Sequence, residues 1–203
     1  MNIYELEHIL KKKANDSAED LIRYALLEAL APIEDFSFAI DILREQYSKY
    51  NDFRIAVLIS FWMSTWENYK PNDFLECLNE FLLNGSNQQK AIIYYLNAYD
   101  IFMRSRQWHK QNEYVDFLKK SVDLSEKFVY NFYRLAQVSD KETAKKLMEK
   151  AFSNVEKVNN EEECRNMRME NFLDFEVFLQ EYILGTELSE PNFATLQDFH
   201  SAL

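Results

Sequence analysis

The sequence predicts an all-α fold made of about five antiparallel helix hairpins and a terminal capping helix, within one domain over residues 1–203. Apolar residues recur at helical spacing along nearly the whole chain. The chain has only 2 Gly and 3 Pro, too few for the tight turns that connect strands. Residues that favour helix starts also return at a nearly constant interval, which indicates an internal repeat.

Periodic runs and the residues at their ends define the expected helices. They lie at about 3–13, 17–31, 35–49, 52–69, 72–84, 87–105, 112–123, 125–138, 140–157, 160–184 and 190–202. Gly85 and Gly185 each follow an apolar run directly. The first position after a helix often takes the left-handed conformation, which favours glycine. The prolines stand near expected helix starts, at Pro32, Pro71 and Pro191.

The expected N-caps of successive first helices reveal the repeat. They are Ser17, Asp52, Asn87, Ser125 and Asn160, which lie 35, 35, 38 and 35 residues apart. Each interval holds two helices and two short turns, and the hairpin units are therefore 17–51, 52–86, 87–124, 125–159 and 160–203. Since one hairpin cannot bury its apolar face alone, neighbouring units are expected to stack.

Two helices show where the stack has its middle and its end. The run 87–105 is apolar nearly all round, as expected of a helix between neighbours. The run 190–202 is apolar on one side only, which suits a helix that covers the last hairpin. Trp62 and Trp66, one turn apart on an apolar helix, are expected in the core.

Residues 87–158 also carry a family resemblance. A large residue followed by a Leu–small pair occurs at Phe132, Leu135 and Ala136, and small residues seven apart occur at Ala144 and Ala151, with Ser121 in the later small position one unit earlier. In these features the chain resembles degenerate tetratricopeptide repeats. The resemblance implies a right-handed superhelix in which the first helices of the units line a concave surface.

The implied surface carries two parallel stripes of cations, amides and apolar groups. One follows the first helix of the third unit, at Lys90, Tyr94, Asn97, Ile101 and Arg104. The other follows the next unit, at Lys127, Asn131, Arg134 and Val138. Such stripes could hold an extended or helical segment through amide hydrogen bonds and cation–carboxylate contacts. The alternative is that these are ordinary exposed residues or partners of the acidic C-terminal helix.

Trp108 lies in the loop between the two helices of the third unit. A tryptophan there could anchor a partner, because Trp is enriched at the residues that dominate binding energies. The alternative is that it packs back onto its own hairpin.

Charge and hydropathy limit the classes of partner. The net charge is −11, which repels the phosphate backbone and makes general nucleic-acid binding unexpected. Residues 101–150 hold 11 bases and 7 acids (+4), whereas 151–203 hold 3 bases and 11 acids (−8). No apolar stretch is long enough for a membrane span, and no export signal precedes the first helix. With two cysteines, too few for a disulfide framework, this favours a cytoplasmic location.

No set of residues points to catalysis, to a metal or to another cofactor. Glu5 and His8 have the spacing of one half of a di-iron motif, but the chain lacks the second half. Asn160 and Glu163 suit a capping box, which accounts for the acidic run before Cys164. The chain also lacks a Gly-rich phosphate loop and a nucleophile elbow. The expectation is therefore a non-enzymatic protein without a cofactor.

Three functions remain open from the sequence. The first is a scaffold that binds a protein or peptide on the concave face. The second is an acidic inhibitor, immunity protein or secretion chaperone that neutralises one protein partner through the C-terminal quarter. The third is a peptide-sensing regulator.

Overall fold

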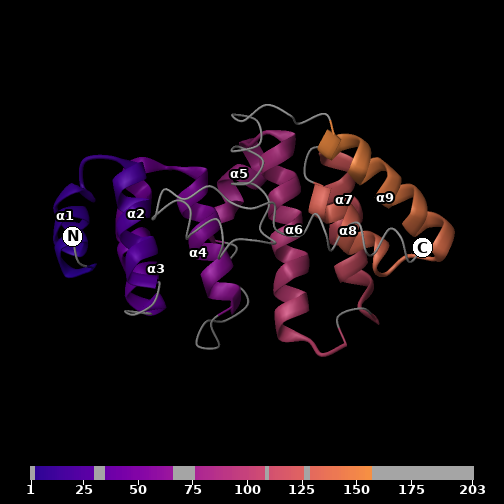
Figure 1. Ribbon diagram of the computed structural model, residues 1–203, viewed down its shortest axis with the longest axis horizontal. Helices are drawn as coiled ribbons and strands as arrows, with labels where there is room; N and C mark the ends of the chain where they lie inside the picture. The colour runs from indigo at the N-terminus through magenta and orange to yellow at the C-terminus, as the bar shows by residue number, and fades with distance from the viewer. Residues whose placement is uncertain (1–2, 30–34, 66–75, 108–109, 126–128, 157–203) are drawn as a thin grey trace. The chain divides into compact units, whose positions relative to one another are not determined.

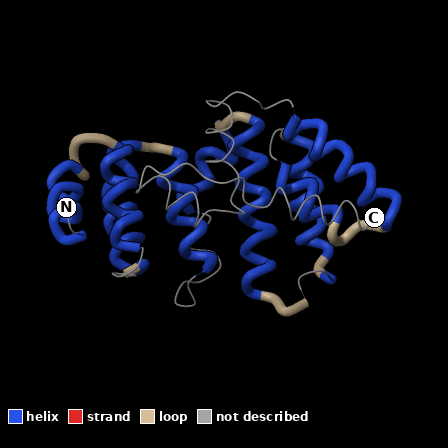
Figure 2. The backbone as a smooth tube through the Cα atoms, in the orientation of Figure 1, coloured by secondary structure: helices blue, strands red, loops and turns tan. Residues whose placement is uncertain are grey.

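A computed structural model describes residues 3–29, 35–65, 76–107, 110–125 and 129–156. Within these ranges the chain forms nine α-helices, one 3₁₀-helix and the loops that join them, and no strand (Figure 2). The helices are α1 (Ile3–Lys13), α2 (Ala18–Ala29), α3 (Phe36–Tyr50), α4 (Phe53–Thr65), η1 (Glu76–Leu78), α5 (Asn79–Asn84), α6 (Asn87–Arg104), α7 (Asn112–Leu124), α8 (Val129–Ala136) and α9 (Lys141–Glu156). The all-α prediction is confirmed for this part of the chain.

The described residues divide into two compact units, one that ends at Phe81 and one that begins at Leu82, so that the boundary falls within α5. Figure 1 labels the helices of each unit. In the first unit α1 packs on α2, α2 on α3, α3 on α4, and α4 on η1. In the second unit α6 packs on α7, α7 on α8, and α8 on α9. Consecutive helices thus pack in antiparallel order within each unit, as the hairpin pattern predicts.

Several predicted helix starts are confirmed by their caps. Ser17 Oγ accepts the backbone N–H of Asp20 at 3.0 Å, and Asp52 Oδ1 accepts that of Arg54 at 2.8 Å. Asp140 Oδ1 likewise accepts the N–H of Thr143 at 3.0 Å before α9. Each bond satisfies one of the donors that the first turn of a helix leaves without a partner.

One expected cap is displaced by a residue in the structure. The N-cap of α6 is Ser86 and not Asn87, because Ser86 Oγ accepts the Gln89 N–H while Gln89 Oε1 accepts the Ser86 N–H. In this reciprocal capping box the side chains of Ser86 and Gln89 each accept the backbone N–H of the other, and the pair requires Ser86 as the N-cap. Ser125 is the C-cap of α7, since its N–H donates to the Ser121 carbonyl, and the residues between it and α8 lie outside the described part of the chain.

The core of the first unit consists of aliphatic residues from α2, α3 and α4 together with one large aromatic. Its largest fully buried side chains are Leu21, Ile22, Leu26, Ile40, Leu43, Ile55, Ile59, Trp62 and Met63. Trp62 is buried as predicted and meets the ring of Phe36 edge to face, with centroids 6.1 Å apart. Aromatic pairs favour this geometry because the positive ring edge meets the negative face.

Polar contacts hold the ends of the helices in the first unit together. Asn51 follows α3 in the left-handed conformation, with φ of 44°, and its N–H donates to the Tyr47 carbonyl. Tyr50 Oη donates to the Ala14 carbonyl at 3.3 Å, which ties the end of α3 to the turn after α1. Arg54 pairs with Asp52 at 2.7 Å and with Glu19 of α2 at 2.8 Å.

In the second unit α6 is buried on more than one side. Its buried residues face several directions around the axis: Ala91, Ile92, Ile93, Tyr95, Leu96, Ala98 and Asp100. α6 packs on α7, and its place between two neighbours stays a prediction. Further along, the small residues Ser121, Ala144 and Ala151 are buried, as expected of positions where helices approach closely.

Some predictions fall outside the described residues. These are the helices at 160–184 and 190–202 and the residues Pro32, Trp66, Pro71, Trp108, Lys127, Asn160, Cys164, Gly185 and Pro191. Gly85 directly follows α5, as its expected position requires. Over the described residues, no helix combines the length and apolar character needed to cross a membrane.

Candidate interaction surface

The predicted stripe of α6 is the least buried side of that helix. Lys90, Tyr94, Asn97 and Ile101 are all partly exposed, whereas the residues around the rest of the helix are mostly buried. The spacing of three to four residues keeps these side chains on one face. These four side chains therefore share a partly accessible face of α6.

Tyr94 is joined on this face by two residues of α7. Its ring stacks on that of Phe117, with centroids 6.2 Å apart and planes at 27°. Lys120 Nζ lies over both rings, 5.4 Å from the Tyr94 centroid and 5.8 Å from the Phe117 centroid. Both rings are partly exposed and Lys120 is exposed, so this cluster of two aromatic faces and a cation is open to solvent in part.

We call these residues together the α6–α7 edge: Lys90, Tyr94 and Asn97 of α6 with Phe117 and Lys120 of α7. Lys90 Nζ donates to the Leu83 carbonyl at 3.2 Å, so it also stabilises the C-terminal end of α5. Asn97 Nδ2 donates to the Ile93 carbonyl of its own helix at 2.8 Å. That bond occupies one donor of the amide and leaves the side chain with further hydrogen-bonding capacity.

Arg104 lies on the same stripe but is engaged by a neighbour one turn away. Its Nε donates to Asp100 Oδ1 at 2.6 Å. Burial raises the pKa of the Asp100 carboxyl, and the bond and charge of Arg104 act in the opposite direction. Because removal of Arg104 would leave Asp100 buried without its cation, Arg104 has a structural role.

The α8 residues of the second predicted stripe have different surroundings. Asn131 is 0% exposed, and its Nδ2 donates to Ser121 Oγ at 3.1 Å. Arg134 lies over the ring of Phe102, with Cζ 4.8 Å from the centroid, and Nη1 donates to Gln137 Oε1 at 3.4 Å. Asn131 therefore cannot contact a partner in this conformation, and Arg134 joins α8 to α6.

Arg134 also acts on the buried phenol of Tyr114 in α7. Burial raises the pKa of Tyr114 far above its usual value, while the positive charge of Arg134 lowers it and Tyr95 raises it further.

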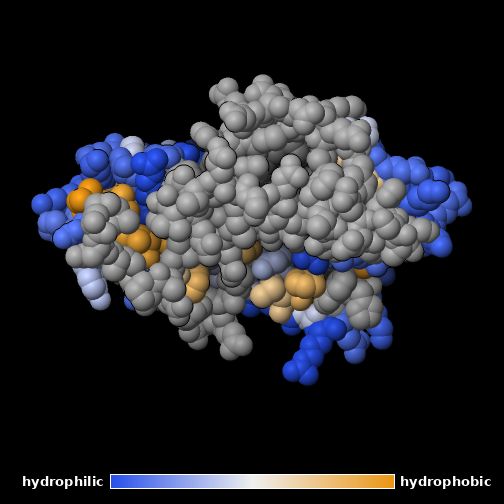
Figure 3. Space-filling model, viewed as in Figure 1, coloured by the Kyte–Doolittle hydropathy of each residue, from blue (hydrophilic) through white to orange (hydrophobic). Residues whose placement is uncertain are grey.

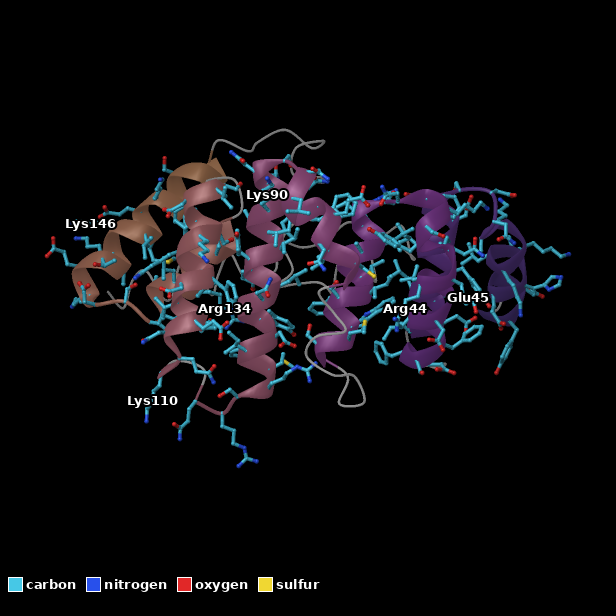
Figure 4. All side chains as sticks on the ribbon, turned by 180° about the vertical axis from the view of Figure 1, so that it is seen from behind. Arg44, Glu45, Lys90, Lys110, Arg134 and Lys146 are labelled. Carbon is cyan, nitrogen blue, oxygen red and sulfur yellow. The ribbon has the colours of Figure 1, made fainter. Side chains whose placement is uncertain are left out.

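In Figure 4, Lys90 lies near the N-terminal end of α6, and Arg134 lies on α8 away from it. Because Asn131 is buried, the described part of the second stripe is not a continuous set of accessible side chains.

Phe117 and Lys120 were not predicted from the sequence. They stand three apart on α7, so they share a face, but their approach to Tyr94 depends on how α7 is aligned along α6. That alignment is fixed by the bond from Ser121 Oγ to the Ala91 carbonyl, at 2.7 Å. The sequence contains the two side chains but no local signal of that alignment.

The described residues contain no group of three or more His, Cys, Asp or Glu side chains that could hold a metal ion. Glu5 and His8 are exposed on α1. Cys77 is partly exposed, and its carbonyl accepts a hydrogen bond from Tyr47 Oη at 3.0 Å. Burial raises the pKa of that phenol to about 12, with contributions from Cys77 and Glu80.

Comparison with known proteins gives no functional assignment. No family model, no curated protein and no solved structure matches the chain. The functional argument therefore depends on the residues and contacts described above.

Proposed function

We propose that this chain is a non-catalytic scaffold that binds a protein or peptide, with the α6–α7 edge as part of its contact surface. The observation that supports this most directly is the partly exposed stack of Tyr94 on Phe117 with Lys120 over both rings. Rigid aromatic side chains offer a large contact area at a low cost in conformational entropy. Aromatic residues are accordingly enriched at the energetic centres of interfaces.

The chemistry of the edge suits a segment that has both apolar and acidic groups. An apolar side chain could lie on the exposed ring surface, while Lys120 and Lys90 could contact a carboxylate. The side-chain oxygen Oδ1 of Asn97 could accept a backbone N–H of the bound segment. We include in the proposal a right-handed superhelix of tetratricopeptide-like hairpins, supported by the burial of Ser121, Ala144 and Ala151 at the small positions of that pattern.

The test has two stages. Affinity capture with the tagged full-length protein in its native cell, followed by mass spectrometry, identifies a partner, which is then purified. The dissociation constant is measured for Tyr94→Ala, for Lys120→Glu and for a matched control, Lys119→Glu, which changes the neighbouring exposed position of α7. We expect Tyr94→Ala and Lys120→Glu to weaken binding about tenfold or more, and the control to have little effect.

Thermal unfolding of each variant separates a loss of contact from a loss of fold. If the purified partner binds Tyr94→Ala and Lys120→Glu as tightly as the unchanged protein, the α6–α7 edge is not its contact surface. The salt dependence distinguishes the neutralising function that the sequence leaves open. If the acidic C-terminal quarter forms the contact, the association rate constant should fall steeply at high ionic strength. If the α6–α7 edge forms the contact, the salt should change mainly the dissociation rate constant.

A further inference from the structure

The chemistry of the α6–α7 edge is complementary to that of a segment in the same chain. Residues 170–181 read ENFLDFEVFLQE, with four acids, six apolar residues and no lysine or arginine. Residues 169–203 together hold seven acids and again no lysine or arginine. The described residues between 82 and 156 hold 11 bases and 8 acids (+3). Opposite charge therefore favours contact between this segment and the second unit.

The edge can receive a carboxylate and an apolar group side by side. Lys120 is exposed, and its ammonium has three N–H donors, so contact with the two ring faces leaves it able to bind a carboxylate. Asp116 and Asp123, both exposed, stand one turn before and one turn after Lys120 on α7. They weaken the attraction of a purely acidic ligand. A ligand for this site therefore also needs apolar groups that cover the rings of Tyr94 and Phe117.

The order of side chains in the segment matches the order along α6. The edge residues of α6 are a cation, a ring and an amide at positions i, i+4 and i+7. Asp174, Phe178 and Glu181 have the same spacing, within a run that the sequence predicts to be helical. In parallel alignment a carboxylate would meet the cation, a ring would meet the ring pair, and the second carboxylate would accept an amide N–H.

The segment can reach the edge within one chain. α9 ends at Glu156, and residues 157–173, which number 17, separate it from Asp174. At a helical rise of about 1.5 Å per residue they span about 25 Å, and fully extended they span about 55 Å. A compact unit of about 100 residues has a radius of gyration of about 13 Å. The connection is therefore long enough for any point on the surface of the second unit.

α9, the described helix nearest to the segment in sequence, offers it little apolar surface. Hydrophilic residues cover α9 on the face shown in Figure 3, at the right of the view. Among the described side chains of α9 the exposed ones are mainly charged: Lys141, Glu142, Lys145, Lys146, Glu149 and Lys150. Phenylalanine side chains of the segment therefore gain more from the rings of the α6–α7 edge.

We propose that residues 170–181 bind the α6–α7 edge of the same chain and compete there with the partner. The competition rests on the proposed function, whereas the contact within the chain does not. A short tether gives an effective concentration in the millimolar range, so a contact with a dissociation constant of about 0.1 mM occupies the edge about nine times in ten. A partner must then displace the segment before it binds.

The experiment is carbodiimide cross-linking of the full-length protein without a partner, followed by mass spectrometry. The reagent joins a carboxylate directly to an amine, so a link reports contact between the two groups. We expect links from Lys90 or Lys120 to Asp174 or Glu181. In a mixture of isotope-labelled and unlabelled protein, the linked peptides should carry one isotope only. Peptides with both isotopes would come from two copies and would overturn a contact within the chain.

Variants separate a specific contact from chance proximity. Tyr94→Ala keeps both lysines but removes a ring, and the yield of links should fall severalfold. Lys120→Glu combined with Asp174→Lys should restore a link between positions 120 and 174, because carboxylate and amine have exchanged places. Lys119→Glu is the control and should leave the links unchanged. The contact is overturned if the unchanged protein gives no link between the edge and residues 170–181, or if Tyr94→Ala leaves the yield unchanged.

The competition is tested with the purified partner. Asp174→Asn together with Glu181→Gln should lower its dissociation constant about tenfold, since the edge is then free more often. The matched control, Glu187→Gln together with Glu190→Gln, removes the same charge outside the segment and should have little effect. An unchanged dissociation constant for the first pair would overturn the competition. Missing links contradict this inference alone, whereas a partner that binds Tyr94→Ala at full strength contradicts the proposed function alone.

Discussion

Asn131 of α8 donates a hydrogen bond of 3.1 Å from Nδ2 to Oγ of Ser121 in α7, and both side chains are fully buried. Ser121 in turn donates to the Ala91 carbonyl of α6 at 2.7 Å. Two hydrogen bonds thus connect three consecutive helices through the core of the second unit. Such bonds are specific to one alignment, because any sliding of α7 leaves buried polar groups without partners.

Ser121→Ala should therefore destabilise the protein by about 1–3 kcal/mol, since it leaves both the Asn131 amide and the Ala91 carbonyl without this partner. The measurement is chemical unfolding of the purified protein in urea. Ser153→Ala, an exposed change on α9, is the control and should stay within about 0.5 kcal/mol. A Ser121→Ala variant as stable as its control would show that the connection contributes no net stability.

The cap of α6 gives a prediction that separates two neighbouring residues. Ser86→Ala removes the acceptor of the Gln89 N–H and should cost about 1 kcal/mol, with lower exchange protection in the first turn of α6. Asn87→Ala should cost much less, because Asn87 is the first residue inside the helix and Ser86 is the N-cap. Thermal unfolding of the two variants compares them directly, and a larger loss for Asn87→Ala would contradict the assigned cap.

Arg54 gives the first unit a stability that depends on pH. Burial acts to raise the pKa of Asp52, but the hydrogen bonds and charge of Arg54 outweigh it, so the pKa is lowered. The stabilisation is then present above the ordinary pKa of an aspartate, about 3.9, and is lost as the pH falls through the lowered value. Arg54→Met should cost about 1 kcal/mol at pH 7, because the pair is partly exposed, and much less at pH 2.

Melting temperatures of Arg54→Met and the unchanged protein at the two pH values test this difference. Arg23→Met is the matched control, since Arg23 also contacts Glu19, at 3.2 Å, but in a more exposed pair. We expect its cost to be smaller and to change less with pH. An equal cost of Arg54→Met at both pH values would rule out the Asp52 carboxylate as the source.

The sequence predicts the described helices well because each depends on local information. The period of apolar residues and the caps at Ser17 and Asp52 lie within a few residues of the feature they specify. The cap at Ser86 was missed by one residue because Ser86 and Asn87 are both favourable N-caps, and only the reciprocal bond with Gln89 distinguishes them.

The candidate site was harder to predict because burial depends on neighbouring helices. Asn131 was expected on the surface because it lies one repeat unit, 37 residues, after Tyr94, yet it stands four residues before the buried Leu135 and so shares its stripe. The polar residue within an apolar stripe is here the sequence signal of burial, and its partner Ser121 comes from another helix.

The left-handed Asn51 has a consequence for how this chain can vary. It and Asp52 are the whole junction between α3 and α4, so the chain reverses direction with no spare length. Glycine could replace Asn51 at little cost, whereas valine or isoleucine would clash with its own backbone there. Divergent versions of this protein should therefore accept insertions at other loops more readily than at this two-residue junction, where the φ angle of Asn51 sets the direction in which α4 leaves α3.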